Sequence, residues 1–464
     1  MQKKLDGDAP DFFAHCETVG ERVLSLDNPL VMGHYDADGL SATALVANAL
    51  KIRNRPFEAR TIKRVDDKLL SSIPSSRSVV FVDLGSGQAE LVEKYFPNAV
   101  IIDHHPPSAQ TDLLQANPHV FGYDGATEAS AASTAYFCFK HLGDARIVEL
   151  GIVGAVGDMQ DQEGLRGLNA RMLGDSVESG VVLRTRDLRM FGRVSRPLVW
   201  FLAYCDEPFL PGLTNNDKAC ALFLRKHRIP LKQDGKWVRY YDLPAQKRKE
   251  LQDALVTYCN ESGVSAEATA SMMGDVYIFL KEPDGTELRD AYEFSTLLNA
   301  CGRHGKAEVG IGVCLGDAGA YEAAHEVLLE HRRAIRSGIF FARKHAFDAG
   351  AFYFLDGRGE IPDTVIGTVA GAYFNSGLVE RNKPILAFSN DEEGNTKVSS
   401  RGCKALIETG LDLGEVMRKA GAAVEGIGGG HNVAAGCSFK PSTENERLFL
   451  KKAKEVIEIQ LQLR

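Results

Sequence analysis

The triplet Asp103-His104-His105 follows directly on the apolar run of residues 99–102. Other side chains able to bind metal stand just after apolar runs or close an apolar stretch, namely His34, Asp36, Asp38, Asp83 and Asp158. In a parallel α/β sheet the carboxyl ends of the strands present such side chains to a ligand crevice. The pattern therefore predicts a metal site.

Carboxylates and imidazoles with no thiolate nearby in the sequence suit Mn²⁺, Mg²⁺ or Zn²⁺ better than a soft metal. Where several aspartates converge, one carboxylate can bridge two cations about 3.5–4 Å apart, an arrangement that supports metal-assisted phosphoester hydrolysis. A lone Asp-x-Asp is more often a turn or a helix cap, and a lone His-His is more often a surface or core pair. The combination of these motifs favours a site over those structural interpretations.

Three short apolar runs would position these side chains: residues 29–32, 78–82 and 99–102. Short runs rich in valine and isoleucine, separated by helix-like segments, are typical of buried parallel strands. Residues 40–52 open with small and hydroxyl residues and carry apolar residues at helical spacing, so they predict a crossover helix. The expected fold class is α/β.

The motifs resemble motifs I to IV of the DHH phosphoesterases. The matching residues are His34-x-Asp36-x-Asp38-Gly39, the strand-end Asp83, the Asp103-His104-His105 triplet and Gly157-Asp158. Gly428-Gly429-Gly430-His431, followed by Asn432 and Ala434-Ala435-Gly436, resembles the glycine-rich motif of the DHH-associated domain. Within the family, residues 299–303 (Asn-Ala-Cys-Gly-Arg) and 399–401 (Ser-Ser-Arg) resemble elements of RecJ exonucleases, and the best match is an archaeal RecJ-like nuclease.

The resemblance implies a ligand set for two divalent cations, Mn²⁺ in preference to Mg²⁺. His34, Asp36 and Asp83 would hold one cation, and the second would be held by Asp38, Asp83, His104 and Asp158, with Asp83 bridging. His105 would face the scissile phosphate, and Asp103 would orient the histidines, because a carboxylate accepts an imidazole N–H.

Substrate contacts are expected from Arg303, Ser399, Arg401 and the segment Gly428-Gly429-Gly430-His431. A guanidinium offers a two-pronged fork for phosphate, and a backbone without Cβ can approach a phosphate or base closely. A glycine run taken alone is more often a flexible turn. By the RecJ resemblance, Ser399 and Arg401 would bind the terminal 5′ phosphate.

A chain of 464 residues is too long for one core, and four segments are expected. Residues 1–190 would form the DHH domain with its parallel sheet and metal site, and residues 191–285 a mostly helical insertion. Residues 286–345 would return to the core and supply a connecting helix, and residues 346–464 would form a smaller α/β DHH-associated domain with a mixed sheet. By the resemblance to archaeal RecJ-like proteins, the insertion would bind the GINS complex or another replisome protein.

The composition is that of an ordinary globular protein, with 44% hydrophobic and 25% charged residues. The charged N-terminus lacks the apolar region of a signal peptide, and no stretch approaches the roughly 18 apolar residues of a membrane span. Nine cysteines without Cys-x-x-Cys pairs favour a reducing compartment. We therefore expect a cytoplasmic protein with no membrane partner.

The net charge of −8 argues against a nucleic-acid binder. Bound cations would offset the clustered carboxylates, however, so the local field matters more than the sum. Basic clusters also occur, and the one placed where the two family-like halves would join contains Arg332, Arg333, Arg336, Arg343 and Lys344. A cluster of this kind is more often a solvated helix face than a nucleic-acid groove.

The expected function is that of a two-metal exonuclease that degrades single-stranded DNA or RNA from an end, in the 5′ to 3′ direction on DNA, in replication or repair. One alternative is a DHH phosphodiesterase for oligoribonucleotides or cyclic dinucleotides; the middle region and the Ser-x-Arg element argue against it. The other is an inactive replisome scaffold, which would have no need to keep costly clustered carboxylates together. The preference for DNA or RNA, the polarity and the physiological metal stay open.

Overall fold

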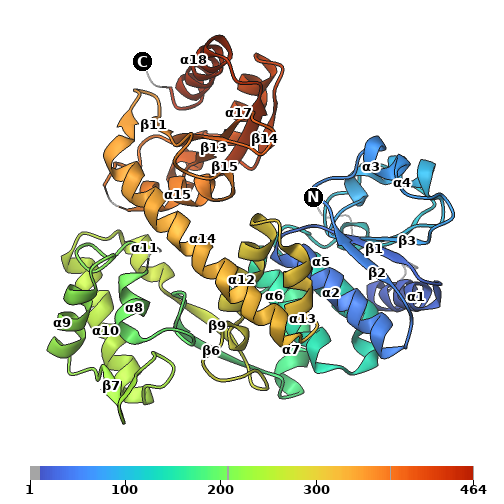
Figure 1. Ribbon diagram of the computed structural model, residues 1–464, viewed down its shortest axis with the longest axis horizontal. Helices are drawn as coiled ribbons and strands as arrows, with labels where there is room; N and C mark the ends of the chain where they lie inside the picture. The colour runs from blue at the N-terminus through green and yellow to red at the C-terminus, as the bar shows by residue number, and fades with distance from the viewer. Residues whose placement is uncertain (1–10, 206–207, 377, 463–464) are drawn as a thin grey trace. The chain divides into compact units, whose positions relative to one another are not determined.

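The computed structural model describes residues 11–205, 208–376 and 378–462 (Figure 1). The chain divides into two compact units. The first contains the chain up to Leu198 together with Gly235–Pro244 and Met273–Leu328, and the second contains Val199–Asp234, Ala245–Met272 and the chain from Leu329 onward. Each unit has its own sheet and its own hydrophobic core.

The first unit is built on a five-stranded sheet of order β2-β1-β3-β4-β5, in which every pairing is parallel. Its strands are β1 (Leu30–Gly33), β2 (Glu58–Thr61), β3 (Val79–Val82), β4 (Val100–Ile102) and β5 (Leu114–Ala116). The predicted α/β class and the three predicted strands are confirmed. The two outer strands, β2 and β5, carry few apolar residues, which explains why hydrophobic runs did not reveal them.

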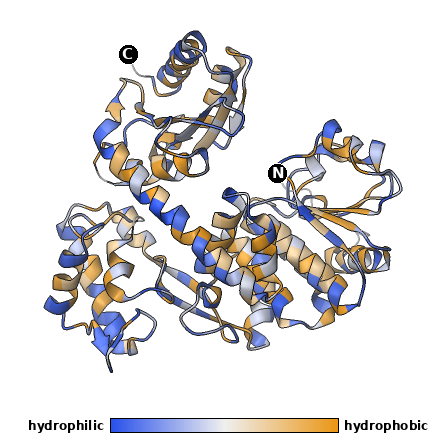
Figure 2. Cartoon of the chain, in the orientation of Figure 1, coloured by the Kyte–Doolittle hydropathy of each residue, from blue (hydrophilic) through white to orange (hydrophobic). Residues whose placement is uncertain are grey.

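Both faces of this sheet are buried, as expected for a parallel sheet. Alternate residues along each strand face opposite sides, so that Val31 and Val80 join one core while Met32 and Phe81 join the other. The larger core includes residues of α1 (Phe12–Ser25), α2 (Ala37–Ile52), α5 (Ala131–Phe139) and α6 (Ala145–Gly157), and the smaller includes residues of α3 (Asp67–Ser71) and α4 (Ala89–Tyr95). The helices α2, α5 and α6 are mostly apolar in Figure 2.

The remaining elements of the first unit pack around this core. They are the helix α7 (Gly167–Glu178), the antiparallel ribbon of β6 (Val182–Leu188) and β9 (Met273–Phe279), and the helices α12 (Ala291–Arg303) and α13 (Ala307–Cys314). Four short 3₁₀ helices are η1 (Ser86–Gln88), η2 (Pro118–Phe121), η3 (Lys140–Leu142) and η4 (Glu287–Arg289). The long helix α14 (Ala318–His345) begins in the first unit and continues into the second, whose part of the helix carries the basic cluster of residues 332–344.

The second unit contains a six-stranded mixed sheet of order β10-β11-β12-β13-β15-β14. Its strands are β10 (Phe347–Asp348), β11 (Tyr353–Asp356), β12 (Ile385–Asn390), β13 (Thr396–Arg401), β14 (Ile427–Gly430) and β15 (Ala434–Phe439). Only the pairing of β11 with β12 is parallel. The helices of this domain are α15 (Asp363–Asn375), α16 (Lys404–Glu408), α17 (Leu413–Ala422) and α18 (Thr443–Gln460).

The middle of the chain is largely helical, as predicted. It contains α8 (Leu198–Ala203), α9 (Asp217–Lys226), α10 (Ala245–Glu261), α11 (Ala266–Ser271) and the two-residue strands β7 (Lys232–Gln233) and β8 (Lys236–Trp237). Among the described residues, no helix combines the length and the apolar character needed to cross a membrane.

Candidate functional site

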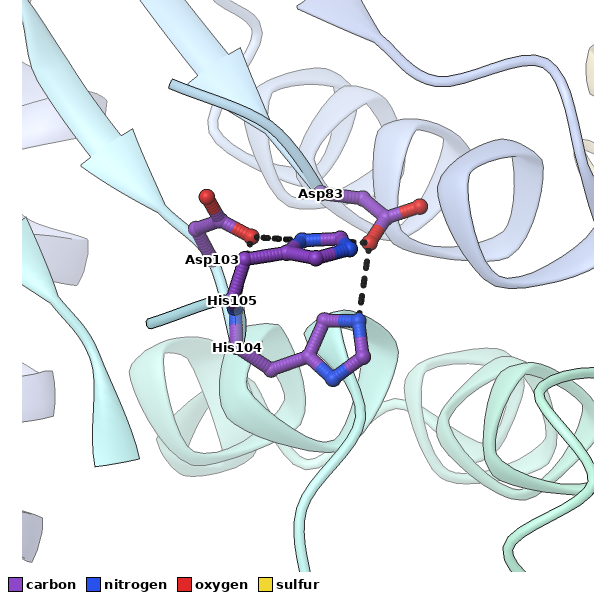
Figure 3. A group of neighbouring side chains, drawn as sticks. All are labelled: Asp83, Asp103, His104 and His105. Carbon is purple, nitrogen blue, oxygen red and sulfur yellow. Dashed lines mark hydrogen bonds and ion pairs between the residues drawn. The ribbon is translucent and has the colours of Figure 1, made fainter. Parts of the chain in front are cut away.

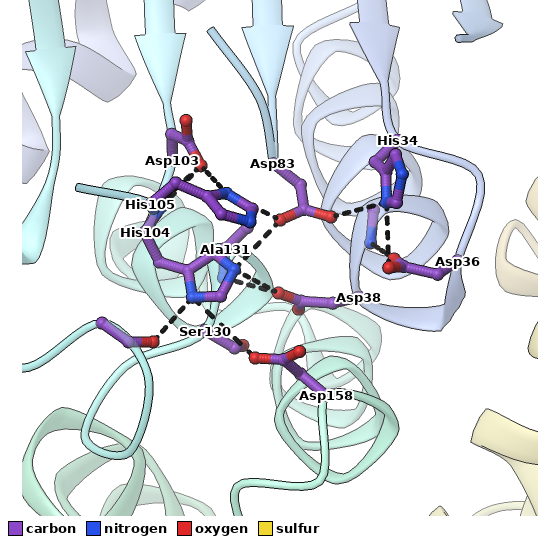
Figure 4. Close-up of polar contacts among 12 residues, drawn as sticks. His34, Asp36, Asp38, Asp83, Asp103, His104, His105, Ser130, Ala131 and Asp158 are labelled. Carbon is purple, nitrogen blue, oxygen red and sulfur yellow. Dashed lines mark hydrogen bonds and ion pairs between the residues drawn. The ribbon is translucent and has the colours of Figure 1, made fainter. Parts of the chain in front are cut away.

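The predicted metal ligands lie together at the carboxyl edge of the parallel sheet (Figure 4). His34 follows β1, Asp83 follows β3 and Asp103 follows β4, while Asp36 caps the N-terminus of α2 by accepting a hydrogen bond from Gly39 N at 2.9 Å. Asp158 caps the C-terminus of α6. Parallel strands end at the same edge, so residues distant in the sequence meet here.

Asp83 lies between two histidines. Its Oδ2 is 3.6 Å from His34 Nδ1 (Figure 4), and its Oδ1 is 3.2 Å from His104 Nε2 (Figure 3). Its backbone adopts the left-handed conformation with φ of 61°, which is uncommon outside glycine and which turns the chain sharply after β3. The two oxygens of this one carboxylate therefore face two separate groups of ligands.

The first group consists of His34, Asp36 and Asp83. His34 Nδ1 lies 2.9 Å from Asp36 Oδ2. Burial opposes the charged form of both residues, but their mutual hydrogen bond and attraction prevail, so the pKa of His34 rises to about 11 and that of Asp36 falls to about 2. Without a metal, a proton on His34 offsets the acids.

The second group consists of Asp38, His104 and Asp158. Asp38 is buried and accepts hydrogen bonds from Ala131 N at 2.7 Å and Ala132 N at 2.9 Å, in the first turn of α5. A side chain at Gly154 of α6 would collide with the Asp38 carboxylate. The N–H groups at the positive end of α5 thus hold Asp38 in place, and Gly154 leaves the space that its carboxylate occupies.

The tautomer of His104 is set by the Gly125 carbonyl, which lies 2.7 Å from His104 Nδ1. Because a carbonyl only accepts, Nδ1 must carry the hydrogen. A neutral His104 therefore directs the lone pair of Nε2 at Asp83 Oδ1 and at Asp38 Oδ2, which lies 3.8 Å away. This is the orientation of a metal-binding histidine whose other nitrogen is fixed by a backbone oxygen.

Asp103 is fully buried and accepts hydrogen bonds from the backbone N–H groups of Ser86, His104 and His105. It also accepts one from His105 Nδ1 at 2.8 Å, which leaves His105 Nε2 available on a side chain that is 54% exposed. Burial raises the pKa of Asp103, but the hydrogen bond and charge of His105 outweigh burial and lower the pKa to about 2. Asp103 thus fixes both members of the His-His pair.

The donor set fits hard or borderline divalent cations, because it consists of carboxylate oxygens and imidazole nitrogens. Asp83 Oδ1 is buried and lies 3.2 Å from His104 Nε2, which carries a lone pair when the imidazole is neutral, so both atoms can bind a cation. Burial, reinforced by neighbouring carboxylates, raises the pKa of Asp38, Asp83 and Asp158 to about 6. Crowded acids with raised pKa values are the state that a bound cation relieves.

The Asn-Ala-Cys-Gly-Arg element has a contact that the sequence did not reveal. Asn299 Oδ1 accepts a hydrogen bond from Ala37 N at 3.0 Å, and a side chain at Gly302 would collide with the Tyr35 carbonyl. Helix α12 therefore packs closely against the turn that carries His34, Asp36 and Asp38. Arg303 ends α12 and is exposed to solvent. Desolvation by the surrounding protein lowers the pKa of its guanidinium, and the charges of Tyr35 and Asp36 oppose this by raising it.

The residues predicted to bind substrate in the C-terminal region lie together in the second unit. Ser399 and Arg401 alternate on β13, Ser399 pairs with Gly436 of β15, and Gly436 pairs with Gly429 of β14. Paired residues in a sheet share a face, and a Cβ at Gly429 would meet open space. The Ser399 hydroxyl and the Arg401 guanidinium thus lie on the same face of the sheet as Gly436 and Gly429. These two glycines leave the backbone bare, and we call this bare backbone the open floor.

The glycine-rich segment is a strand rather than the flexible turn that its composition suggests. Gly428, Gly429 and Gly430 belong to β14, which pairs with β15, and the exposed His431 follows it. A side chain at Gly428 would collide with the Met417 carbonyl of α17. Glycine is needed here because a helix packs closely against the strand.

Three family models match the chain: the N-terminal domain of the DHH family over residues 28–153, the DHH-CID domain over residues 190–273 and the DHHA1 domain over residues 354–459. A relative from Methanocaldococcus jannaschii, itself uncharacterized, is 29% identical over 441 residues, which cover 93% of each chain.

Several solved structures share the fold. CDC45 from Entamoeba histolytica has a TM-score of 0.65 at 12% identity, with 96% of this chain and 98% of that chain covered. RecJ from Thermus thermophilus in complex with Mn²⁺ has a TM-score of 0.58 at 16% identity, with 97% of this chain covered; this chain spans only 55% of that protein. A manganese-bound exonuclease RecJ has a TM-score of 0.56 at 15% identity, with coverage of 97% and 95%.

Proposed function

We propose that this chain, a member of the DHH family by its DHH, DHH-CID and DHHA1 domains, is a two-metal exonuclease that degrades single-stranded nucleic acid. The observation that carries the proposal is the position of Asp83, whose two carboxylate oxygens face two separate groups of acids and histidines. A shared carboxylate between two ligand groups is the arrangement of a two-metal phosphoesterase.

In this proposal His34, Asp36 and Asp83 hold one cation, and Asp38, Asp83, His104 and Asp158 hold the other. Mn²⁺ is favoured over Mg²⁺ because two imidazoles are among the ligands, and the RecJ structures that share the fold contain Mn²⁺ or Mg²⁺. When bound, such cations lower the pKa of an attacking water and offset charge that develops on the phosphate.

The protein's own side chains then position the substrate. His105 presents Nε2 from an exposed ring, so it can donate a hydrogen bond to a non-bridging phosphate oxygen when it is protonated. The hydrogen bond and charge of Asp103 raise the pKa of His105 despite partial burial, which favours this protonated form. Asp103 acts through His105 by holding its Nδ1–H.

The substrate is proposed to be single-stranded DNA, degraded from the 5′ end. Ser399 and Arg401 would bind the terminal phosphate. The open floor at Gly429, which lies between Gly428 and Gly430 on β14 and has His431 after it, would admit a sugar or base. Arg303 would contact the backbone near the Asp36 side of the metal centre. The role in replication or repair rests on the RecJ resemblance.

The test is digestion of single-stranded DNA and RNA, labelled at the 5′ or the 3′ end, with Mn²⁺ or Mg²⁺. We expect metal-dependent release of short products from the 5′ end of DNA, and none from the double variant Asp36→Ala, Asp38→Ala. Asp253→Ala is the matched control, because this exposed acid on α10 pairs only with Lys249 among the contacts of its carboxylate described for the chain. Cleavage of dinucleotides or cyclic dinucleotides without polymer degradation would replace the exonuclease proposal with the small-substrate alternative.

A replisome scaffold is the second candidate, because the fold is shared with CDC45 over nearly the whole chain. The complete set of ligand groups around Asp83 favours an active enzyme. The two candidates separate in one assay: a scaffold would bind partners without hydrolysing polymers or dinucleotides under any metal.

For the GINS partner expected from the resemblance, the proposed contact is the helical insertion. Leu222 on α9 is 65% exposed and offers an apolar side chain for such a contact. Co-elution of the chain with purified GINS, lost in Leu222→Glu but kept in Asp253→Ala, would support this contact; co-elution unaffected by Leu222→Glu would place it elsewhere.

A further inference from the structure

The chain makes an unusual turn directly after Asp158. Gln160 N donates to Ala155 O at 3.0 Å, and Met159 N donates to Val156 O at 3.1 Å. Met159 adopts the left-handed conformation with φ of 60°. These bonds form a Schellman motif, which ends α6 and usually requires glycine at the position of Met159. The turn directs Gln160 back toward the metal centre although Met159 itself is exposed.

The side chain of Gln160 is buried and connects several groups around the second cation site. Its Nε2 donates to Asp158 Oδ2 at 2.7 Å and to Gly125 O at 2.9 Å, with Ala129 O at 3.2 Å as a third acceptor. Its Oε1 accepts from Asn169 Nδ2 at 2.6 Å. The amide can point only one way, because its nitrogen faces oxygens and its oxygen faces an N–H donor.

The Gly125 carbonyl connects Gln160 to the histidine as well. The same oxygen accepts from His104 Nδ1 at 2.7 Å, so its two lone pairs serve His104 and Gln160 together. A side chain at Gly125 would collide with the His104 carbonyl, so glycine at this position allows the loop to lie close to His104. The Gln160 amide therefore contacts Asp158 directly, and it is connected to His104 through the Gly125 carbonyl, which accepts a hydrogen bond from each of them.

We propose that Gln160, held in orientation by Asn169, is a positioning residue that sets the spacing of His104 and Asp158 for the second cation. It touches no ligand of the first group, which consists of His34, Asp36 and Asp83. The proposal rests on the metal-dependent function proposed above, but not on the nature of the substrate. The expected effect is selective: loss of Gln160 lowers the affinity for the second cation and leaves the affinity for the first unchanged.

The experiment measures Mn²⁺ binding to the metal-stripped full-length chain, by the electron paramagnetic resonance signal of free Mn²⁺. The variants are Gln160→Ala, Gln160→Glu and Asn169→Ala. The control is Asn48→Ala, because Asn48 Nδ2 also donates to a carboxylate that caps α6, Asp144 Oδ1 at 3.0 Å, but at the opposite end of the helix. Loss of a partner that orients a metal ligand typically costs about 10–100-fold in affinity.

We expect two bound ions in the unsubstituted chain and in Asn48→Ala. In Gln160→Ala one ion keeps its affinity and the other weakens about 10–100-fold, and Asn169→Ala shows the same selectivity to a smaller degree. Gln160→Glu keeps the size of the side chain but replaces a donor with an acceptor that faces Asp158, so it also weakens only the second ion. Unchanged binding of both ions, equal loss of both ions, or a single ion in the unsubstituted chain would each overturn the proposal.

A second readout comes from the metal dependence of hydrolysis of whichever phosphodiester the chain cleaves. The concentration of Mn²⁺ that gives half-maximal activity rises about 10–100-fold in Gln160→Ala, and kcat at saturating Mn²⁺ returns to at least half of its original value. A permanent loss of kcat at saturating Mn²⁺ would contradict a positioning role. Intact, selective Mn²⁺ binding without hydrolysis of polymers would leave the inference standing and remove the exonuclease proposal.

Discussion

In the first unit the candidate site lies at the carboxyl edge of a parallel sheet and consists of acids and histidines. In the second unit it lies on the face of a mixed sheet, where glycines leave the backbone bare beside one serine and one arginine. The first site is made by crowding charged side chains together, and the second by omitting side chains. The two candidate sites would hold phosphate in different ways, the first through cations bound by acids and the second through a guanidinium beside exposed backbone.

The two sites also differ in what they cost the folded protein. Burial raises the pKa of Asp83 to about 6, so above that pH the charged carboxylate destabilises the metal-free fold. The site in the second unit asks for no comparable crowding, since its floor consists of backbone that is already hydrogen-bonded within the sheet. In the first unit, therefore, a substitution that removes a buried charge should lower activity while it raises the stability of the metal-free protein.

The largest effect is expected from Asp83→Asn, which keeps the shape of the side chain but removes its charge. Hydrolysis should fall by about 10³-fold or more, because both ligand groups lose their shared member. A carboxyl with a raised pKa contributes stability below about pH 4 that is lost as the pH rises through about 6. At about pH 7.5 the metal-free variant should therefore melt at a higher temperature than the unsubstituted chain.

Thermal unfolding with and without Mn²⁺ checks this prediction. The unsubstituted chain should gain stability on adding Mn²⁺, whereas Asp83→Asn should gain little. A metal-free variant that melts at a lower temperature would show that Asp83 stabilises the fold through its histidine contacts, which would contradict a net destabilising effect of its charge.

The next effect is the pH dependence of Mn²⁺ affinity. In the metal-free chain burial raises the pKa of Asp38, Asp83 and Asp158 to about 6, and the neighbouring acids raise the pKa of His34 and His104 against burial. A cation must displace these protons, so affinity should fall by about tenfold or more per pH unit as the pH drops through about 6. Mn²⁺ titrations at about pH 5.5, 6.5 and 7.5 measure the slope, and a flat profile would contradict a site made of these residues.

The sequence predicted the first site far better than the second. Strand-end aspartates and histidines are rare at such spacings by chance, and the topology of a parallel sheet brings them together. Asn299 was recognised only as part of the Asn-Ala-Cys-Gly-Arg motif, and Gln160 was not recognised at all. An asparagine or glutamine alone has no distinctive spacing, and the roles of these two depend on contacts with Ala37, Asp158 and Gly125. The glycine strand was recognisable only by its family motif, since hydrophobic periodicity cannot reveal a strand without side chains.

A smaller effect is expected from Arg401→Ala in the second unit. A charged hydrogen bond to phosphate contributes about 1.5–3 kcal/mol, so KM for a 5′-phosphorylated oligonucleotide should rise about 10–100-fold. KM for the same oligonucleotide with a 5′ hydroxyl should change little. Equal losses on both substrates would show that Arg401 serves the sheet rather than the terminal phosphate.

The smallest effect is expected from substitutions that fill the space around Arg401, and they test whether Arg401 needs that space to bind phosphate. A Cβ at Gly367 of α15 would lie 2.5 Å from Arg401 Nη2 and 3.3 Å from Ser399 Oγ, whereas a Cβ at Gly371 would lie no closer than 3.8 Å to any Arg401 atom. Gly367→Ala should displace only the flexible end of the guanidinium, and alanine should favour the helix by roughly 0.5–1 kcal/mol at either position. We therefore expect both variants to melt at or above the original temperature, while only Gly367→Ala raises KM for the 5′-phosphorylated substrate, by a few-fold to about tenfold. If Gly367→Ala and Gly371→Ala behave alike in the same assay, the bare surface of α15 is a packing feature, and the contrast between the two sites reduces to the arginine alone.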